Sequence, residues 1–161
     1  MKWFKNEKKG TYVIEDAQII FKNFAGAARK FNAAGNRNFN VFIDDPKLVD
    51  ILAEEGFNVR ILPARDEEDE PRHVLKINVS YKKIPPTIVQ HTGRNSVNLD
   101  EEDIAGLDST FISSVDVEFS PYRFQREDGS EGRSAYLRTL HVILEEDVFA
   151  DKYAEEEHPG E

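Results

Sequence analysis

The sequence contains no cysteine, and this absence excludes several kinds of chemistry. Without thiols the chain has no disulfide, no thiolate metal site and no cysteine nucleophile, which fits a reducing compartment such as the cytoplasm. The motifs Gly-x-Ser-x-Gly, His-Glu-x-x-His and Gly-x-x-x-x-Gly-Lys-Ser/Thr are also absent. The four histidines, His73, His91, His141 and His158, lie in four separate segments. We therefore expect no catalytic residues, no metal site and no cofactor.

Long hydrophobic runs are missing as well. No window approaches the roughly 18 consecutive apolar residues that predict a membrane-spanning helix. The first ten residues, MKWFKNEKKG, are basic but hold no apolar run of the length found in signal peptides. A chain of 161 residues is long enough to form one domain with a substantial core. We expect one globular domain and no association with a membrane.

Charge is unevenly distributed along the chain. The formal net charge is −10, yet residues 1–98 carry 16 Lys and Arg against 13 Asp and Glu. Residues 99–161 carry 5 against 18, and the last seventeen residues hold eight acids and one lysine. The net charge of the whole chain is therefore a poor guide to the charge of any one surface. The sequence predicts a folded domain over 1–146 and an acidic, disordered tail over 147–161.

The acidic run over 66–70, DEEDE, raises the question of a cation site. It lacks the spacing and the glycine of a calcium loop, and we interpret it as solvated surface. A metal-dependent nuclease that uses Asp44, Asp45 and this run is the weakest interpretation, because no ligand set matches a recognised motif.

Hydrophobic periodicity predicts a mainly β fold. Apolar and polar residues alternate cleanly over 37–43, and Asp45 and Gly56 frame a short helix over 46–55 as its N-cap and its glycine stop. Further strands are predicted over 11–24, 57–64, 72–86, 109–124 and 134–146, with one or two short extended segments within 87–99 and a helical turn or loop over 100–108. Six or seven strands without βαβ alternation predict a small antiparallel barrel with one short helix.

Aromatic and basic residues occur together in three segments. Sequence-tolerant binding of single-stranded nucleic acid needs cationic groups along the phosphates and exposed aromatic faces for the bases. The first segment holds Lys22, Phe24, Arg29, Lys30, Phe31 and Arg37. The second holds Tyr81, Lys82 and Lys83, and Arg94 lies in a loop that could join the segments. The third, a long hairpin around Asp128 and Gly129, holds Tyr122, Arg123, Phe124, Arg126, Arg133, Tyr136 and Arg138.

A role in the core competes with a binding role for each aromatic residue. Aromatic residues in strands are more often core than binding platforms. Three phenylalanines alternate with other apolar residues and are expected in the core: Phe21, Phe39 and Phe119. The alternation breaks at Pro121, so Tyr122 and Phe124 fit either role. Phe31 lies between Lys30 and Asn32 in a loop, which favours exposure.

Two longer stretches resemble a known family. AQIIFKNFAGAARKFNAAGNRNFNVFIDD (17–45) resembles the opening of phage-encoded single-stranded DNA-binding proteins with an oligonucleotide/oligosaccharide-binding (OB) fold. FISSVDVEFSPYRFQREDGSEGRSAYLRTLHVILEED (111–147) resembles their closing hairpin. By residue, the resemblance points to Phe24, Arg37, Phe39, Tyr122, Phe124 and Tyr136. One departure is the end of the chain, Pro159-Gly160-Glu161, where many such tails carry an aromatic residue.

The resemblance implies a non-enzymatic protein that binds single-stranded DNA without strong sequence preference. It also implies a role in phage or prophage DNA replication or recombination, in the cytoplasm of a bacterial host. The acidic tail would occupy the basic groove in the free protein and contact replication or recombination proteins, and the sequence is compatible with a homodimer. The alternative is a phage structural or assembly β-protein, such as a tail or head accessory subunit, with the aromatic-basic hairpin as a subunit contact.

Overall fold

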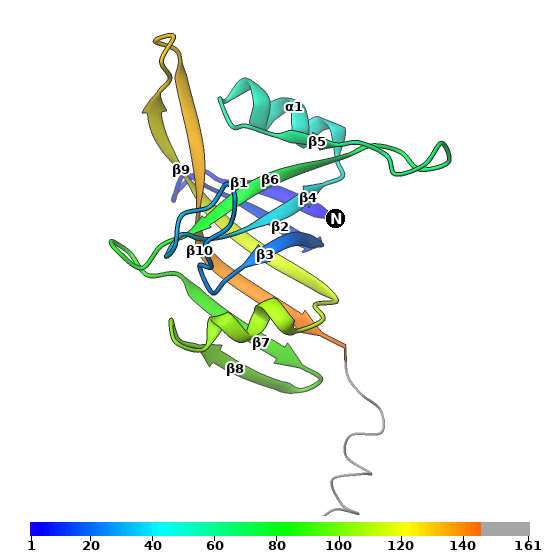
Figure 1. Ribbon diagram of the computed structural model, residues 1–161, viewed down its shortest axis with the longest axis vertical. Coiled ribbons are helices and arrows are strands. Elements are labelled where there is room, and N and C mark those ends of the chain that lie inside the picture. Colours follow the sequence, from blue (N-terminus) through cyan, green and yellow to red (C-terminus); the bar gives the residue numbers. More distant parts are fainter. Residues whose placement is uncertain (146–161) are drawn as a thin grey trace, which may run out of the picture.

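The computed structural model describes residues 1–145, which form mainly β-strands (Figure 1). The predicted acidic tail over 147–161 lies outside the described residues. In chain order the strands are β1 (Lys2–Asn6), β2 (Thr11–Ala17), β3 (Ile19–Asn23), β4 (Arg37–Ile43), β5 (Arg60–Leu62), β6 (Arg72–Val79), β7 (Thr87–Thr92), β8 (Asn95–Leu99), β9 (Ser114–Gln125) and β10 (Glu131–Leu144). Helix α1 (Pro46–Glu54) follows β4, and a 3-10 helix, η1 (Ile104–Ser109), precedes β9.

The sheet closes on itself through a bend between β2 and β3. Ala17 pairs with β9, whereas Ile19 pairs with β4 at the other end of the sheet. At the bend Asp16 adopts a positive φ of 53°, and its backbone N–H donates to a carboxylate oxygen of Asp116 at 2.8 Å. A positive φ is uncommon for residues other than glycine and marks a local turn of the chain. β2 and β3 thus act as one bent strand that joins both ends of the sheet.

Five strands then form the barrel. Starting from the bent β2–β3 strand, the order is β4, β6, β10, β9 and back to β2. Most neighbours are antiparallel, but β10 pairs in parallel with β6 and, further along, with β7. The barrel is therefore not wholly antiparallel, whereas the sequence predicted an antiparallel one. A parallel pair needs a long connection between its strands, and here β7, β8, η1 and β9 lie between β6 and β10 in the chain. A closed five-stranded Greek-key barrel of this kind is the OB fold.

Alternate residues of the barrel strands fill its interior. Tyr12 stacks on Phe119 with ring centroids 5.3 Å apart, and Phe57 meets these two rings edge-on at 5.6 and 5.9 Å. Phe24 and Phe39 form a second stacked pair at 5.2 Å. All five rings are buried, which confirms the expected core role of Phe39 and Phe119.

The two helices cover opposite ends of the barrel (Figure 1). The side chain of Asp45 caps α1, as the sequence predicts, and the helix buries Leu48 and Leu52 against the core. At the other end η1 buries Ile104 and Leu107. The barrel is therefore filled and covered, and its outer face is what remains for ligands.

Several strands differ from the sequence-based expectations. The predicted strand over 11–24 is divided in two, and Phe21, expected in the core, is 55% exposed with a φ of 55°. β3 is irregular between Ile20 and Asn23, and this irregularity turns Phe21 outward. β1 was not predicted, and the segment over 57–64 contributes only the short β5. The described residues form ten strands, whereas the sequence predicted six or seven.

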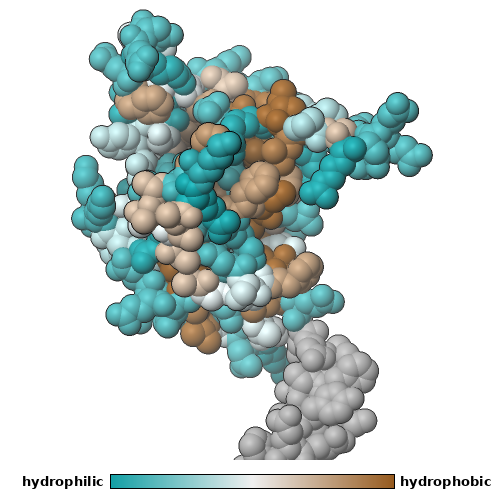
Figure 2. Space-filling model, viewed as in Figure 1, coloured by the Kyte–Doolittle hydropathy of each residue, from teal (hydrophilic) through white to brown (hydrophobic). Residues whose placement is uncertain are grey.

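Two segments project far from the barrel: the β9–β10 hairpin and the loop over 63–71 (Figure 1). Hydrophilic residues cover both, and hydrophobic residues gather over α1 and β5 between them (Figure 2). The acidic run over 66–70 lies on the second projection, and all five residues are exposed, as expected of a solvated run. Within residues 1–145, no helix has the length and apolar character needed to cross a membrane.

Candidate nucleic-acid interface

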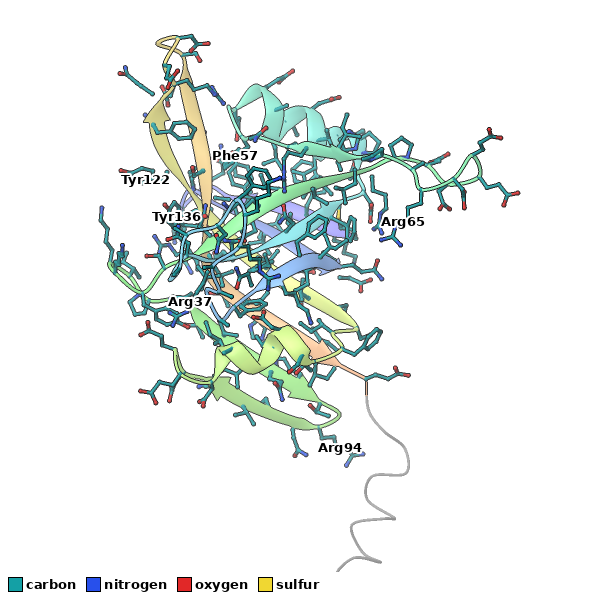
Figure 3. All side chains as sticks on the ribbon, viewed as in Figure 1. Arg37, Phe57, Arg65, Arg94, Tyr122 and Tyr136 are labelled. Atoms are coloured by element: carbon teal, nitrogen blue, oxygen red, sulfur yellow. The ribbon has the colours of Figure 1, made fainter. Side chains whose placement is uncertain are left out.

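A trough crosses the outer face of the barrel where β4, β6, β9 and β10 meet the loop over 80–86. It consists of two adjoining hollows of about 280 and about 460 Å³ that share Ser80, Lys82 and Tyr136. Its polar and aromatic lining comprises Asn36, Arg37, Lys76, Asn78, Ser80, Tyr81, Lys82, Lys83, Glu101, Ser120, Tyr122, Tyr136 and Arg138. Figure 3 shows Arg37, Tyr136 and Tyr122 following one another along one side of the barrel.

Strand periodicity places these side chains on the outer face. In β6, Lys76 and Asn78 point outward between the buried residues Leu75, Ile77 and Val79. β9 and β10 likewise direct alternate residues into the core, and among their outward residues Ser120, Tyr122, Tyr136 and Arg138 line the trough. The trough is therefore built on paired strands, and one loop forms its wall.

An aromatic pair forms one end of the trough. Tyr122 of β9 and Tyr136 of β10 lie 5.7 Å apart between ring centroids, at 64° to each other. Tyr122 is 54% exposed, and the ammonium group of Lys83 lies 5.9 Å from its ring centroid. An exposed ring beside a cation is the combination on which an unpaired base can stack while its phosphate is neutralised.

At the other end of the trough, Arg37, Tyr81 and Glu101 form a second cluster, whose side chains contact one another and are less available to a ligand. The guanidinium group of Arg37 lies 5.4 Å from the centroid of the Tyr81 ring and pairs with the carboxylate of Glu101 at 2.8 Å. The Tyr81 ring packs against the core, and burial raises the pKa of its hydroxyl while the charge of Arg37 opposes that rise. Tyr81 therefore supports Arg37, and its ring is a poorer base platform than the sequence suggested.

The charge of the trough is opposite to that of the chain. Five cationic residues line it, namely Arg37, Lys76, Lys82, Lys83 and Arg138. Among residues 1–145, Glu101 is the one acidic residue in this lining, and Arg37 neutralises it. A local excess of positive charge attracts phosphates even when the net charge of the chain is negative.

The loop between β3 and β4 borders the trough. Its last residues, Gly35 and Asn36, line the trough beside Arg37. The side-chain amide of Asn32 lies within hydrogen-bond distance of three backbone carbonyls of the same loop, at 2.9 to 3.2 Å. Phe31 projects with 90% of its surface exposed, and the ammonium group of Lys30 lies 5.4 Å from its ring. Arg29 is also exposed on this loop. The predicted residues of the loop thus lie next to the trough, outside its lining.

The projecting hairpin uses two of its predicted arginines for structure. Arg126 donates to the backbone carbonyls of Gly56 at 3.0 Å and Glu131 at 2.7 Å. Arg133 is mostly buried beside Glu55, with 3.9 Å between the charged groups. Both arginines fasten the hairpin to the segment after α1, so they are not available along a bound strand.

Two other predicted residues sit on the same hairpin but away from the trough. Phe124 is 39% exposed, with the guanidinium group of Arg126 5.6 Å from its ring. Arg123 is largely exposed and lies 3.4 Å from the carboxylate of Glu131. The hairpin could extend a binding surface outward, but its tip is not part of the concave face.

Three further predicted residues are not brought to the trough. Phe24 is fully buried against Phe39, so it cannot stack on a base and belongs to the core. Lys22 donates its ammonium hydrogens to the carbonyls of Leu107 and Thr110, where it ties β3 to η1. Arg94 lies in the β7–β8 turn, far from Tyr122 and Tyr136 (Figure 3).

Sequence reasoning missed Lys76, Asn78 and Ser80 as lining residues. Their signal was present, because these residues alternate with Leu75, Ile77 and Val79 and must share one face of a strand. The sequence alone does not predict that β6 pairs with β10, and this pairing brings the outer face of β6 next to Tyr136.

The fold and this trough define a class of protein: an OB barrel with aromatic and cationic side chains on a concave face binds single-stranded nucleic acid. The chain belongs to the family described as "Putative phage ssDNA-binding domain", whose model matches residues 3–158. The expected family resemblance is thereby confirmed, and membership favours nucleic-acid binding over a structural phage subunit. No curated protein sequence matches the chain.

The solved structures of the phage Enc34 protein support the fold. The single-stranded DNA-binding protein from bacteriophage Enc34 in complex with ssDNA is similar with a TM-score of 0.56 and 11% identity, over 89% of this chain and 91% of that one. The Enc34 protein in a second structure gives 0.53, 11% identity and 91% of each chain. Gp2.5, a single-stranded DNA binding protein encoded by bacteriophage T7, gives 0.46 and 12% identity over 88% of this chain and 96% of that one. The expectation of a mainly β, OB-like fold is confirmed.

Proposed function

We propose that this protein binds single-stranded DNA along the trough between Tyr122 and Arg37. The observation that carries the proposal is the joining of two hollows into one concave surface, to which the described part of the chain contributes five cations and a single, paired carboxylate. A DNA strand in this trough would lie across the outer face of β6 and β10. The 80–86 loop would flank the strand on one side, and the β3–β4 loop would lie near the Arg37 end of the trough.

Each part of the trough has a role in this proposal. Bases stack on Tyr122 and Tyr136, and Phe31 offers a further exposed ring beside the trough. Phosphates lie near Arg37, Lys76, Lys82 and Lys83, with Arg29 and Lys30 of the adjacent loop as outlying contacts. Stacking and charge neutralisation are available to every base, which supports binding without strong sequence preference.

The biological setting follows from the same proposal. A protein that coats single-stranded DNA acts where such strands are exposed, in phage DNA replication or recombination. The acidic segment over 147–161 has a charge that complements the trough, and we propose that it competes with DNA and recruits replication or recombination proteins. Truncation before Asp147 should then tighten DNA binding, and an unchanged affinity would remove the segment from the mechanism. Assembly as a homodimer and the domain boundary at residue 146 stay predictions.

A titration tests the proposal. Fluorescence anisotropy of a labelled oligo-dT of about 30 nucleotides, long enough for one OB domain, is measured at several salt concentrations, with a duplex of equal length as the comparison. We expect binding that weakens steeply with salt, because displaced counterions accompany each neutralised phosphate. Absence of binding at micromolar protein in low salt would end the proposal, and equal affinity for the duplex would end its single-strand specificity.

A further inference from the structure

β10 contains a bulge at Arg138. Leu137 pairs with Phe119 and Thr139 with Glu118, so Arg138 is an extra residue without a partner in β9. The bulge moves the next buried residue from position 139 to Leu140. Arg138 follows Tyr136 by two residues, faces outward on the same side and lines the hollow beside Tyr122. β-bulges are common next to functional sites.

The guanidinium group of Arg138 connects three parts of the chain. Its Nε donates to the hydroxyl of Ser120 in β9 at 3.1 Å, and one Nη donates to the backbone carbonyl of Ile84 at 3.3 Å. Within residues 1–145 no carboxylate lies within 4.0 Å of it. The planar fork of an arginine can make both hydrogen bonds at once in fixed directions, which a lysine ammonium on a flexible stem does poorly.

Ile84 belongs to the loop that carries two cations of the trough. The loop leaves β6 at Ser80, whose hydroxyl accepts from the backbone N–H of Lys82 at 3.3 Å. Beyond Ile84 the chain continues as two prolines, which have no backbone N–H to donate. Ile84 itself is 62% exposed and so is not held by burial. Pro86, two residues further on, is buried. The hydrogen bond from Arg138 therefore fixes the exposed part of the loop, between Ser80 and Pro86, that places Lys83 beside Tyr122.

We propose that Arg138 is a positioning residue that holds the 80–86 loop as a preformed cationic wall of the trough. The proposal rests on the proposed function for its effect on DNA binding. The guanidinium group acts through the loop: it keeps Lys82 and Lys83 directed at the strand, so that binding does not first have to order them. A direct phosphate contact by Arg138 is the competing role, and the two roles predict different behaviour of a lysine substitution.

The test combines Arg138→Lys, which keeps the charge, with Lys83→Ala in a double-mutant cycle. Oligo-dT affinity is measured for the wild type, both single variants and the double variant. We expect Arg138→Lys to weaken binding by about tenfold, and to weaken it by less than about threefold when Lys83 is already absent, because the positioned group is gone. Arg94→Lys, in the distant β7–β8 turn, is the matched control and should bind as the wild type does.

Two outcomes of the cycle overturn the proposal. Wild-type affinity in Arg138→Lys means that only the charge at this position matters. An equal loss in the presence and absence of Lys83 means that the substitution perturbs the barrel in general, without acting through the loop. In contrast, a direct phosphate contact would show as full rescue by lysine, together with a salt slope reduced by about 0.7 in Arg138→Gln.

Hydrogen exchange tests the same positioning without DNA. Backbone amides of Lys82, Lys83 and Ile84 in the free protein should exchange faster in Arg138→Lys than in the wild type, while amides of β4 stay unchanged. Unchanged exchange in the loop overturns the proposal even if the affinity falls. If the wild type fails to bind oligo-dT, the proposed function is wrong, but faster loop exchange would still support the structural part of this inference.

Discussion

Tyr122 provides the sharpest test of the stacking surface. Its ring is 54% exposed at the end of the trough, packed edge-on against Tyr136 and 5.9 Å from the ammonium group of Lys83. Substitution by alanine removes the platform for one base, which is worth about 1–3 kcal/mol. That range corresponds to a rise in the dissociation constant of roughly 5- to 150-fold. Because the ring is exposed, the free energy of unfolding should change by less than about 1 kcal/mol.

Tyr122→Phe is the matched control, because it keeps the ring and removes only the hydroxyl. We expect its affinity for oligo-dT to lie within about twofold of the wild type, which is small beside the stacking energy of one base. Anisotropy titrations supply the affinities, and urea denaturation checks that each variant is folded. Binding by Tyr122→Ala within twofold of the wild type would refute the stacking role. A loss in Tyr122→Phe as large as in Tyr122→Ala would assign the effect to the hydroxyl.

Three further predictions follow from individual contacts. Phe24→Ala should lower the free energy of unfolding by about 3–5 kcal/mol in urea denaturation, because its buried ring leaves a cavity; a loss below 1 kcal/mol would contradict its core position. Lys76→Ala should reduce the salt slope of oligo-dT binding by about 0.7, as expected for one lost phosphate contact on a single strand; an unchanged slope would place the phosphates elsewhere. The indole N–H of Trp3 donates to Asp45 and lowers the pKa of that carboxyl below its ordinary value of 3.8. The contact between Trp3 and the ionised Asp45 carboxylate therefore stabilises the fold fully above the pKa that Asp45 has in the unfolded chain. This stabilisation is lost as the pH falls through the lower pKa that Asp45 has in the folded protein. Acid unfolding followed by Trp3 fluorescence should show this loss, Asp45→Asn should lessen it, and equal acid sensitivity in both proteins would refute it.

Local sequence patterns predicted those parts of the fold that local chemistry decides. The strand over 37–43 and the helix start at Asp45 match β4 and α1, because strict alternation and an N-cap aspartate each favour one local structure. The bend between β2 and β3 was not predictable in this way. It depends on the hydrogen bond from Asp16 to Asp116, which are a hundred positions apart in the chain.

The candidate site shows the same limit. Tyr122, Tyr136 and the lysines of the 80–86 loop, which the sequence predicted to bind nucleic acid, line one surface in the structure, and their contact with DNA stays a prediction. The sequence could not separate Phe24, which follows β3 and turns into the core, from Phe31, which projects from the same loop. Side-chain direction at a strand end depends on the irregularity of β3, and no residue pattern records that irregularity.

Arginines posed a different difficulty. Arg126 and Arg133 look like phosphate ligands in the sequence because they flank an exposed hairpin turn. In the structure they instead contact Gly56 and Glu55 of a segment about seventy residues earlier. Long-range partners of this kind decide whether a cation is available to a ligand, and they become visible only when the segments are placed side by side.

A hydrogen-exchange footprint of the full chain with and without oligo-dT tests the central claim most directly. The account predicts slower exchange on DNA binding in peptides that cover 35–37, 76–84, 120–123 and 135–138, which line the trough. Peptides over 60–71 and 94–99, on other parts of the surface, should be unchanged. Protection confined to those two segments, with none across β6 and β10, would contradict the account.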